Sequence, residues 1–226
     1  MNTPRTQKRP RLLFALCGSV LLLPHGGERA ARASRPMPTT CSYSTWAWDT
    51  RKKQSVNHQR VKKPYSQITA EEKDPHSGCT VCEEDQEAIE LEGRPPIYIC
   101  KDYAGAVRQI MNTLMVAGFP VRSIEGYRVG RSKGPADAQG LRTQFSNHSF
   151  GTAIDFNSEI NGLYTDCFTF GAGCHLLRGG AWQPGQPGTI TRDSVIYRAF
   201  MQVGWKWGGE LLGRQKDFMH FSLHGD

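Results

Sequence analysis

The stretch Ser146-Asn147-His148-Ser149-Phe150-Gly151-Thr152-Ala153-Ile154-Asp155-Phe156 places a histidine and an aspartate seven residues apart, on either side of a glycine. Its last four residues are too few for a helix and include Ile and Phe, so they predict a strand over 153–156. His148 would lie on the loop that enters this strand, and Asp155 would lie within it. A buried carboxylate is costly unless it is paired, and a metal ion is an efficient partner.

A second stretch, Asp217-Phe218-Met219-His220-Phe221, offers another histidine in an apolar setting, in a predicted final strand over 218–223. With the first stretch it supplies two histidines and one carboxylate. That is the ligand count of a catalytic zinc, which keeps its fourth position for water. We therefore predict a Zn²⁺ site whose ligands are His148, Asp155 and His220.

A hydrolytic zinc site also needs a base for the attacking water and a partner for the developing oxyanion. Asp217 lies three residues before His220, where it can face the metal without binding it. Arg128 follows a predicted strand over 121–127 and is a cation for the oxyanion or for a substrate carboxylate. We predict Asp217 and Arg128 as the catalytic residues. His224 is predicted to be an exposed terminal residue.

The N-terminal residues 1–33 have the pattern of a secretory signal peptide. A basic start precedes the apolar run 12–23, and Ala31-Arg32-Ala33 gives a small-x-small cleavage site. Six of the 28 basic and one of the 21 acidic residues lie in this segment, which leaves 22 basic and 20 acidic residues in the mature chain. The net charge of +7 is thus mostly a property of the targeting segment. The composition predicts no nucleic-acid partner and no integral membrane segment after signal removal.

Cysteine usage agrees with export. Six cysteines follow the predicted cleavage site, an even number that favours disulfides in an oxidising compartment. Six cysteines allow 15 pairings, and the spacing favours one pair, Cys167 with Cys174. The pair Cys79 and Cys82 could be a redox motif or half of a zinc site, but disulfides to other cysteines are favoured. The remaining two are Cys41 and Cys100.

The rest of the chain is predicted to form an N-terminal extension and one domain. Residues 34–95 are polar and contain cysteines, and 34–65 is expected to be a solvated linker or extension with a possible attraction to anionic envelope polymers. Residues 96–226 would form the domain. Apolar periodicity predicts helices over 103–117 and 193–203. Two glycine-containing segments, 131–144 and 161–188, are predicted as loops, the second a surface for substrate.

Three motifs resemble the zinc peptidases of the D-Ala-D-Ala carboxypeptidase and L-alanyl-D-glutamate endopeptidase family, which act on bacterial peptidoglycan. Ser146-x-His148-x-x-Gly151-x-Ala153-x-Asp155 is similar to the family's first metal motif. Trp205-x-Trp207-Gly208-Gly209, followed by Asp217-x-x-His220-Phe221, is similar to its second. Gly126-Tyr127-Arg128 resembles the segment with its transition-state arginine. The resemblance covers roughly residues 96–226, and the Asp-x-x-His spacing favours the endopeptidase branch.

The resemblance implies an α+β domain with a small antiparallel sheet flanked by helices, a Hedgehog/D-Ala-D-Ala peptidase-like zinc domain. It implies that His148, Asp155 and His220 bind zinc. It also implies that Asp217 is the general base and that Arg128 stabilises the oxyanion. It implies that Ser146 positions the substrate, and we expect Tyr127 and Trp207 to contact it as well. The expected substrates are peptidoglycan stem peptides, and the expected location is the periplasm or cell envelope of a bacterium, where the protein would act as a monomer.

Two interpretations from other classes remain open. One is a non-catalytic, zinc-stabilised cell-wall-binding module, because fold alone does not give function. The other is an envelope-adhesion protein that uses its basic segment, whose binding would be abolished by salt and unaffected by a chelator. Within the enzyme class, D,D-carboxypeptidase or D,D-endopeptidase activity is the alternative to cleavage of the L-alanyl-D-glutamate bond.

Overall fold

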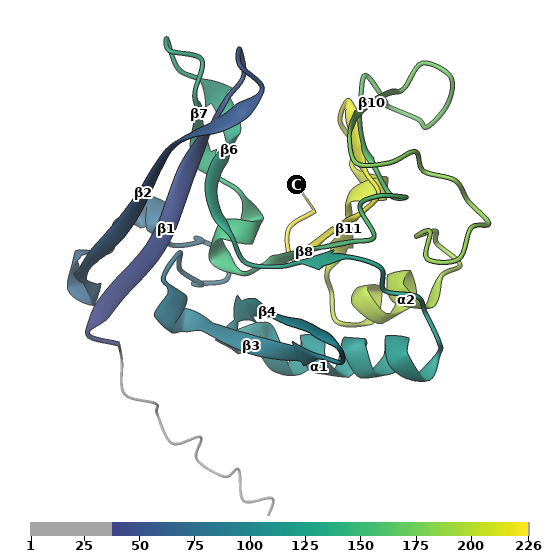
Figure 1. Cartoon of the computed structure of the whole chain (residues 1–226), viewed down its shortest axis with the longest axis horizontal. Helices are drawn as coiled ribbons and strands as arrows, with labels where there is room; N and C mark the ends of the chain where they lie inside the picture. Colours follow the sequence, from purple (N-terminus) through teal and green to yellow (C-terminus); the bar gives the residue numbers. More distant parts are fainter. Residues whose placement is uncertain (1–37, 226) are drawn as a thin grey trace, which may run out of the picture. The chain divides into compact units, whose positions relative to one another are not determined.

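The computed structural model describes residues 38–225, and the predicted signal peptide with Cys17 lies outside them. The described residues belong to one compact unit. They form a mixed α+β structure with two α-helices and several small sheets (Figure 1), which confirms the predicted fold class at that level. No helix in this part of the chain has the length and apolar character needed to cross a membrane.

The main hydrophobic core lies between the two α-helices and one small sheet. The helices are α1 (Lys101–Val116) and α2 (Val195–Gln202), which confirms both helices predicted from the apolar periodicity. Each turns its apolar stripe inward, and in α2 the Phe200 ring stacks on Phe221 of the sheet at 4.2 Å. The sheet has the order β11 (Lys206–Trp207), β13 (His220–Ser222), β8 (Ala153–Phe156), β5 (Ile124–Glu125).

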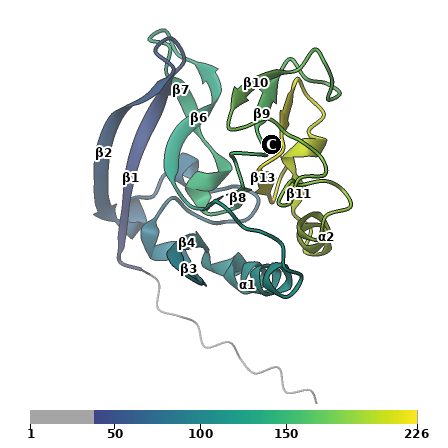
Figure 2. The ribbon, with the colours of Figure 1, turned by 45° about the vertical axis from the view of Figure 1, so that its right-hand side comes forward.

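Two further sheets stand on either side of β8 in both views (Figures 1 and 2). One has the order β2 (Gln54–Pro64), β1 (Thr40–Asp49), β6 (Val129–Ala136), β7 (Arg142–Phe145). The other has the order β10 (His175–Arg178), β9 (Leu163–Thr165), β12 (Gln215–Asp217). A hairpin of β3 (Gln86–Leu91) and β4 (Arg94–Cys100) leads into α1. The short 3-10 helices are η1 (Tyr65–Gln67), η2 (Ala70–Glu72), η3 (Glu83–Asp85), η4 (Asn147–Phe150) and η5 (Gly208–Glu210).

The predicted strand over 153–156 is confirmed as β8. The strand predicted over 218–223 is shorter, because Phe218 and Met219 form the turn between β12 and β13. Of the strand predicted over 121–127, only Ile124 and Glu125 pair with β8.

Two segments without a clear apolar pattern are strands rather than irregular chain. The polar segment 34–65 contains β1 and β2, and the segment 131–144 forms most of the β6–β7 hairpin. The loop expected over 131–144 is therefore wrong, and of the linker or extension expected over 34–65 the unstructured linker is wrong. The physical reason is that most of β2 is solvent-exposed and that β6 and β7 are mostly half-buried or exposed, so no apolar alternation marks these strands. The segment 161–188 likewise contains the two short strands β9 and β10.

Three disulfides are present among residues 38–225: Cys41–Cys82, Cys79–Cys100 and Cys167–Cys174. The last confirms the predicted local pair, and the first two confirm that Cys79 and Cys82 pair with other cysteines. Together these two bridges connect β1, the loop before η3 and the start of α1. The N-terminal extension is thus covalently joined to the first helix. Three disulfides indicate an oxidising, extracytoplasmic environment.

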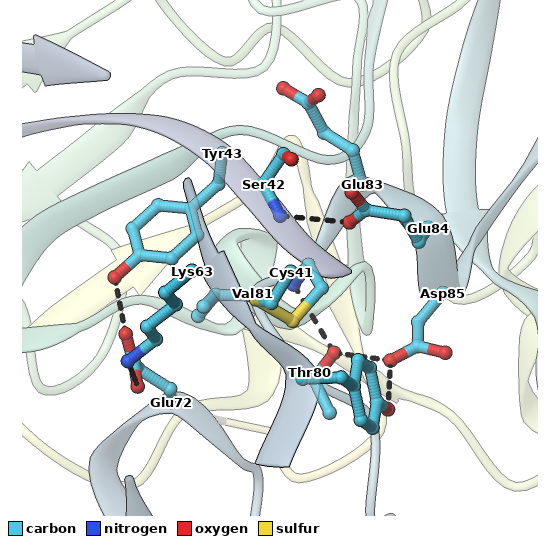
Figure 3. Close-up of a disulfide and its surroundings, with 12 residues drawn as sticks. Cys41, Ser42, Tyr43, Lys63, Glu72, Thr80, Val81, Glu83, Glu84 and Asp85 are labelled. Carbon is cyan, nitrogen blue, oxygen red and sulfur yellow. Dashed lines mark hydrogen bonds and ion pairs between the residues drawn. A yellow bond between two sulfur atoms is a disulfide. The ribbon is translucent and has the colours of Figure 1, made fainter. Parts of the chain in front are cut away.

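The extension has its own small network around Glu72, next to the Cys41–Cys82 bridge (Figure 3). The buried Glu72 carboxylate accepts hydrogen bonds from Tyr43 and Lys63, and from the backbone N–H of Thr69 at 2.8 Å. Burial alone would raise the pKa of Glu72, but these donors hold it at about 2. The ionised carboxylate therefore ties β1 and β2 to η2.

Candidate metal centre

The three predicted metal ligands come from adjoining elements. Asp155 of β8 and His220 of β13 are directly opposite each other in an antiparallel pair, so their side chains project on the same face. His148 lies in η4, which leads into β8. Gly151 ends η4 in the left-handed conformation, with φ of 66°, and a Cβ there would lie 2.4 Å from the backbone nitrogen of Cys100. Only glycine fits this turn, which explains its place between the histidine and the aspartate.

The side chains converge on one point. Asp155 Oδ1 lies 3.1 Å from His148 Nε2 and 2.8 Å from His220 Nδ1. Within residues 38–225 these three form the group of histidine and carboxylate ligands that could hold a metal ion. In a tetrahedral zinc site with bond lengths of 2.0–2.1 Å, ligand atoms lie about 3.3 Å apart. The two distances from Asp155 Oδ1 are somewhat shorter than that value, and all three ligand atoms lie within 4.8 Å of one another.

The hydrogen bonding of His148 also fits a metal ligand. Its Nδ1–H donates to the carbonyl oxygen of Gly126 at 2.8 Å, which leaves a lone pair on Nε2 of the neutral ring. Burial lowers the pKa of His148, so the neutral ring is favoured. Nε2 has no hydrogen-bond partner among the described residues, although it faces the Asp155 carboxylate. A lone pair and a carboxylate oxygen repel each other unless a cation lies between them, so the residues fit a bound cation.

Asp155 is ionised and anchored on its other side. Burial would raise the pKa of Asp155, but its interactions with neighbouring groups, among them the hydrogen bond with His220 Nδ1 at 2.8 Å, hold it well below its ordinary value. Arg128 Nη2 lies 3.0 Å from Asp155 Oδ2, and Arg128 Nε lies 2.9 Å from Glu125 Oε1. The structure thus brings Arg128 to the metal centre, as expected, with its guanidinium held between two carboxylates.

Asp217 ends β12, just before the turn into β13. Burial raises the pKa of its carboxyl to about 6, and its Oδ1 has no hydrogen-bond partner in the described part of the chain. A buried carboxyl with a pKa near neutrality and an unused oxygen can exchange a proton with a substrate. Gly208 packs against this residue, since a Cβ there would lie 2.3 Å from the carbonyl oxygen of Asp217.

Of the other predicted substrate contacts, Ser146 and Trp207 are buried and Tyr127 is partly buried. Ser146 is buried as the residue before η4, and its hydroxyl lies 3.4 Å from that of Ser149. Tyr127 donates its hydroxyl to the carbonyl of Val81 at 2.6 Å. Trp207 is a core residue whose Nε1–H donates to the carbonyl of Phe218 at 2.9 Å. It thereby supports the turn that joins Asp217 to His220.

His224 is exposed, as expected, but it also makes contacts within the chain. Its Nε2 lies 2.9 Å from Asp74 Oδ2, and its ring lies beside that of His76 at 5.0 Å between centroids. The contact joins the residues that follow β13 to the extension, and it does not include the candidate metal ligands.

Comparison with known proteins agrees with the motifs. Residues 139–223 match the family model described as D-alanyl-D-alanine carboxypeptidase. The resemblance seen in the motifs is therefore confirmed over this segment, which includes Ser146, both metal motifs and Asp217. The family suggests a metallopeptidase with peptide substrates. Arg128 and the extension lie outside the matched segment. No similar curated protein and no similar solved structure was found.

Glu125 is a residue of this centre that the sequence reasoning missed. It is opposite Asp155 in the β5–β8 pair and holds Arg128. Its position three residues before Arg128 was a usable signal, because oppositely charged residues at short spacing often pair. The strand predicted over 121–127 instead suggested only that Arg128 lies at its end.

Proposed function

We propose that this protein is a zinc-dependent peptidase that hydrolyses a peptide bond in peptidoglycan stem peptides. One observation carries the proposal: the ligand atoms of His148, Asp155 and His220 converge, and the charges of Asp155 and His220 act on the neighbouring carboxyl of Asp217, whose buried Oδ1 has no hydrogen-bond partner among the described residues. A binding module would need the ligands but not the base. The family match supports the same reaction class.

Zinc is the metal that this donor set favours, because two imidazoles and one carboxylate are a common catalytic ligand set with one position left open. When bound, zinc would supply Lewis-acid polarisation of the scissile carbonyl and lower the pKa of a coordinated water. The chain itself holds the ligands in place through the Gly126 carbonyl on His148 and through Arg128 on Asp155.

Asp217 would act as the general base and then as the general acid. Its carboxylate would accept the proton of the attacking water and return it to the leaving amine. Arg128 would stabilise the oxyanion with the N–H groups that it has left. A guanidinium carries five N–H donors, and only its Nε and Nη2 face carboxylates here. Ser146, Tyr127 and Trp207 would act as substrate-positioning residues, the last two through the elements they support.

The finer assignments follow from this proposal. Residues 96–226 would be the zinc peptidase domain, with the Hedgehog/D-Ala-D-Ala peptidase-like fold, and residues 34–95 would be its disulfide-linked extension. The protein would act as a monomer in the periplasm or cell envelope of a bacterium. The cleaved bond is either an L-alanyl-D-glutamate bond or a D,D-peptide bond.

Mass spectrometry of muropeptides incubated with the mature protein tests the proposal. We expect new products that appear with zinc and disappear with a chelator or in the Asp217→Asn variant, and their masses will name the bond. Intact muropeptides in the presence of zinc-loaded protein would reject a peptidase of this substrate.

A further inference from the structure

The β10–β9–β12 sheet carries Asp217, and its register shows which side chains lie on the same face as this residue. Asp217 of β12 is opposite Leu163 of β9, and Leu163 is opposite Arg178 of β10. Residues directly opposite across neighbouring strands project on the same face of a sheet. The neighbouring residue Tyr164 projects to the other face, where it packs on Phe218 in the core. Arg178 therefore shares the face of the proposed base, two strands away, or about 10 Å along the sheet.

The Arg178 guanidinium is the outer end of a chain of alternating charges that begins at a metal ligand. Asp155 contacts Arg128, Arg128 contacts Glu125, and Glu125 Oε2 lies 3.5 Å from Arg178 Nη2. The exposed fraction of the side chain rises along this chain. It is 6% for Asp155 and 20% for Arg128, and then 47% for Glu125 and 57% for Arg178. The chain thus leads from the buried metal centre to a half-exposed cation beside it.

Arg178 has donors to spare for a ligand. Among the described residues it makes one ion pair, the 3.5 Å contact with Glu125, and Glu125 is already shared with Arg128 at 2.9 Å. An exposed pair at that distance contributes little to stability. A guanidinium with free N–H groups binds a carboxylate through two parallel hydrogen bonds, which a single long contact does not prevent.

We propose that Arg178 forms a carboxylate-binding subsite of this enzyme, which selects peptides with a free carboxylate close to the scissile bond. The proposal rests on the proposed peptidase function. The carboxylate could be the C-terminal carboxylate of a D-Ala-D-Ala fragment or the free carboxylate of a D-Glu residue. Both present the same chemistry to the guanidinium, and the peptide that is cleaved distinguishes them.

The test uses zinc-loaded mature protein and two pairs of synthetic peptides. One pair is a stem-peptide fragment ending in D-Ala-D-Ala and its C-terminal amide. The other contains an L-Ala-D-Glu bond, with the α-carboxylate of D-Glu free or amidated. For the cleaved pair we expect the amide to have a KM about 10- to 100-fold higher, with kcat little changed, because Arg178 lies away from the reacting atoms.

Arg178→Gln should raise the KM of the free-carboxylate peptide by a similar factor and leave the amide unchanged, and Arg178→Lys should restore part of the difference. Arg192→Gln is the matched control, an exposed arginine paired with Glu210, and it should change neither peptide. If Arg178→Gln affects both peptides equally, or neither, the subsite is absent and the residue only pairs with Glu125.

A binding measurement separates this subsite from the proposed reaction. Calorimetric titration of zinc-loaded Asp217→Asn protein with the same peptides should show a preference for the free carboxylate that Arg178→Gln removes. If the wild-type protein hydrolyses none of the peptides, the peptidase proposal fails, and this titration still decides the subsite. Equal affinity for the acid and the amide would then overturn it.

Discussion

Removal of the Cys79–Cys100 bridge should weaken both the fold and the metal centre. The bridge closes a segment with a sequence separation of 21 residues, and the chain-entropy relation gives about 3.3 kcal/mol of stability for a loop of that size. It also fixes Cys100, whose backbone N–H donates to the carbonyl of Gly151 at 3.0 Å. Gly151 ends η4, the 3-10 helix that carries His148. The bridge therefore helps to hold this candidate metal ligand in place through Cys100 and Gly151.

The assay compares Cys79→Ser/Cys100→Ser with wild type in urea unfolding followed by tryptophan fluorescence, and in zinc titration of the folded protein. We expect a loss of about 3 kcal/mol and a zinc affinity lower by about tenfold, the usual cost of losing support behind a metal ligand. Cys167→Ser/Cys174→Ser is the control, because its separation of 7 residues predicts only about 2.4 kcal/mol and no change in zinc affinity. A double variant at 79 and 100 that binds zinc like wild type would refute the reasoning.

Three further predictions concern the network in the extension, the turn between the ligands and the proposed base. Because Glu72 has its pKa lowered from 4.5 to about 2, its contribution is complete above pH 4.5 and is lost as the pH falls through about 2. In urea unfolding, the free energy of unfolding should therefore be about 3 kcal/mol lower below pH 2 than above pH 4.5 because of this group. Glu72→Gln should remove that part of the pH dependence. Gly151→Ala should cost at least about 2 kcal/mol and weaken zinc binding, whereas Gly105→Ala, in α1 with open space around its Cβ among the described residues, should be neutral or stabilising; equal effects would contradict the turn argument. Since the pKa of Asp217 is raised to about 6 and the base must be ionised, kcat/KM of the zinc-loaded enzyme should rise from pH 5 to pH 7, and a flat profile would argue against this base.

The candidate metal site could be predicted from the sequence because each of its two motifs is local. His148 and Asp155 flank one turn that only glycine can make, and Asp217 and His220 flank another. The pair Cys167 and Cys174 was predictable for the same reason, since proximity along the chain brings the two sulfurs together. Apolar periodicity likewise predicted both α-helices.

The remainder depends on pairing between distant segments, which leaves little trace in the sequence. The strands β1 and β2 pair through their backbones while β2 stays exposed, so no alternation of apolar residues marks it. The bridge Cys41–Cys82 depends on where β1 lies in its sheet. The place of Arg178 on the same sheet face as Asp217 depends on the register of three strands and on an irregularity between Leu176 and Arg178. A one-residue change there would turn the side chain to the other face.

The central claim is that His148, Asp155 and His220 together hold one zinc ion. Native mass spectrometry of the mature protein, after removal of metal and dialysis against a small excess of zinc, tests it most directly. The account predicts one zinc per chain in the wild type and in Asp217→Asn, and none in His220→Ala. A wild-type protein that binds no zinc, or a His220→Ala variant that still binds one, would contradict it.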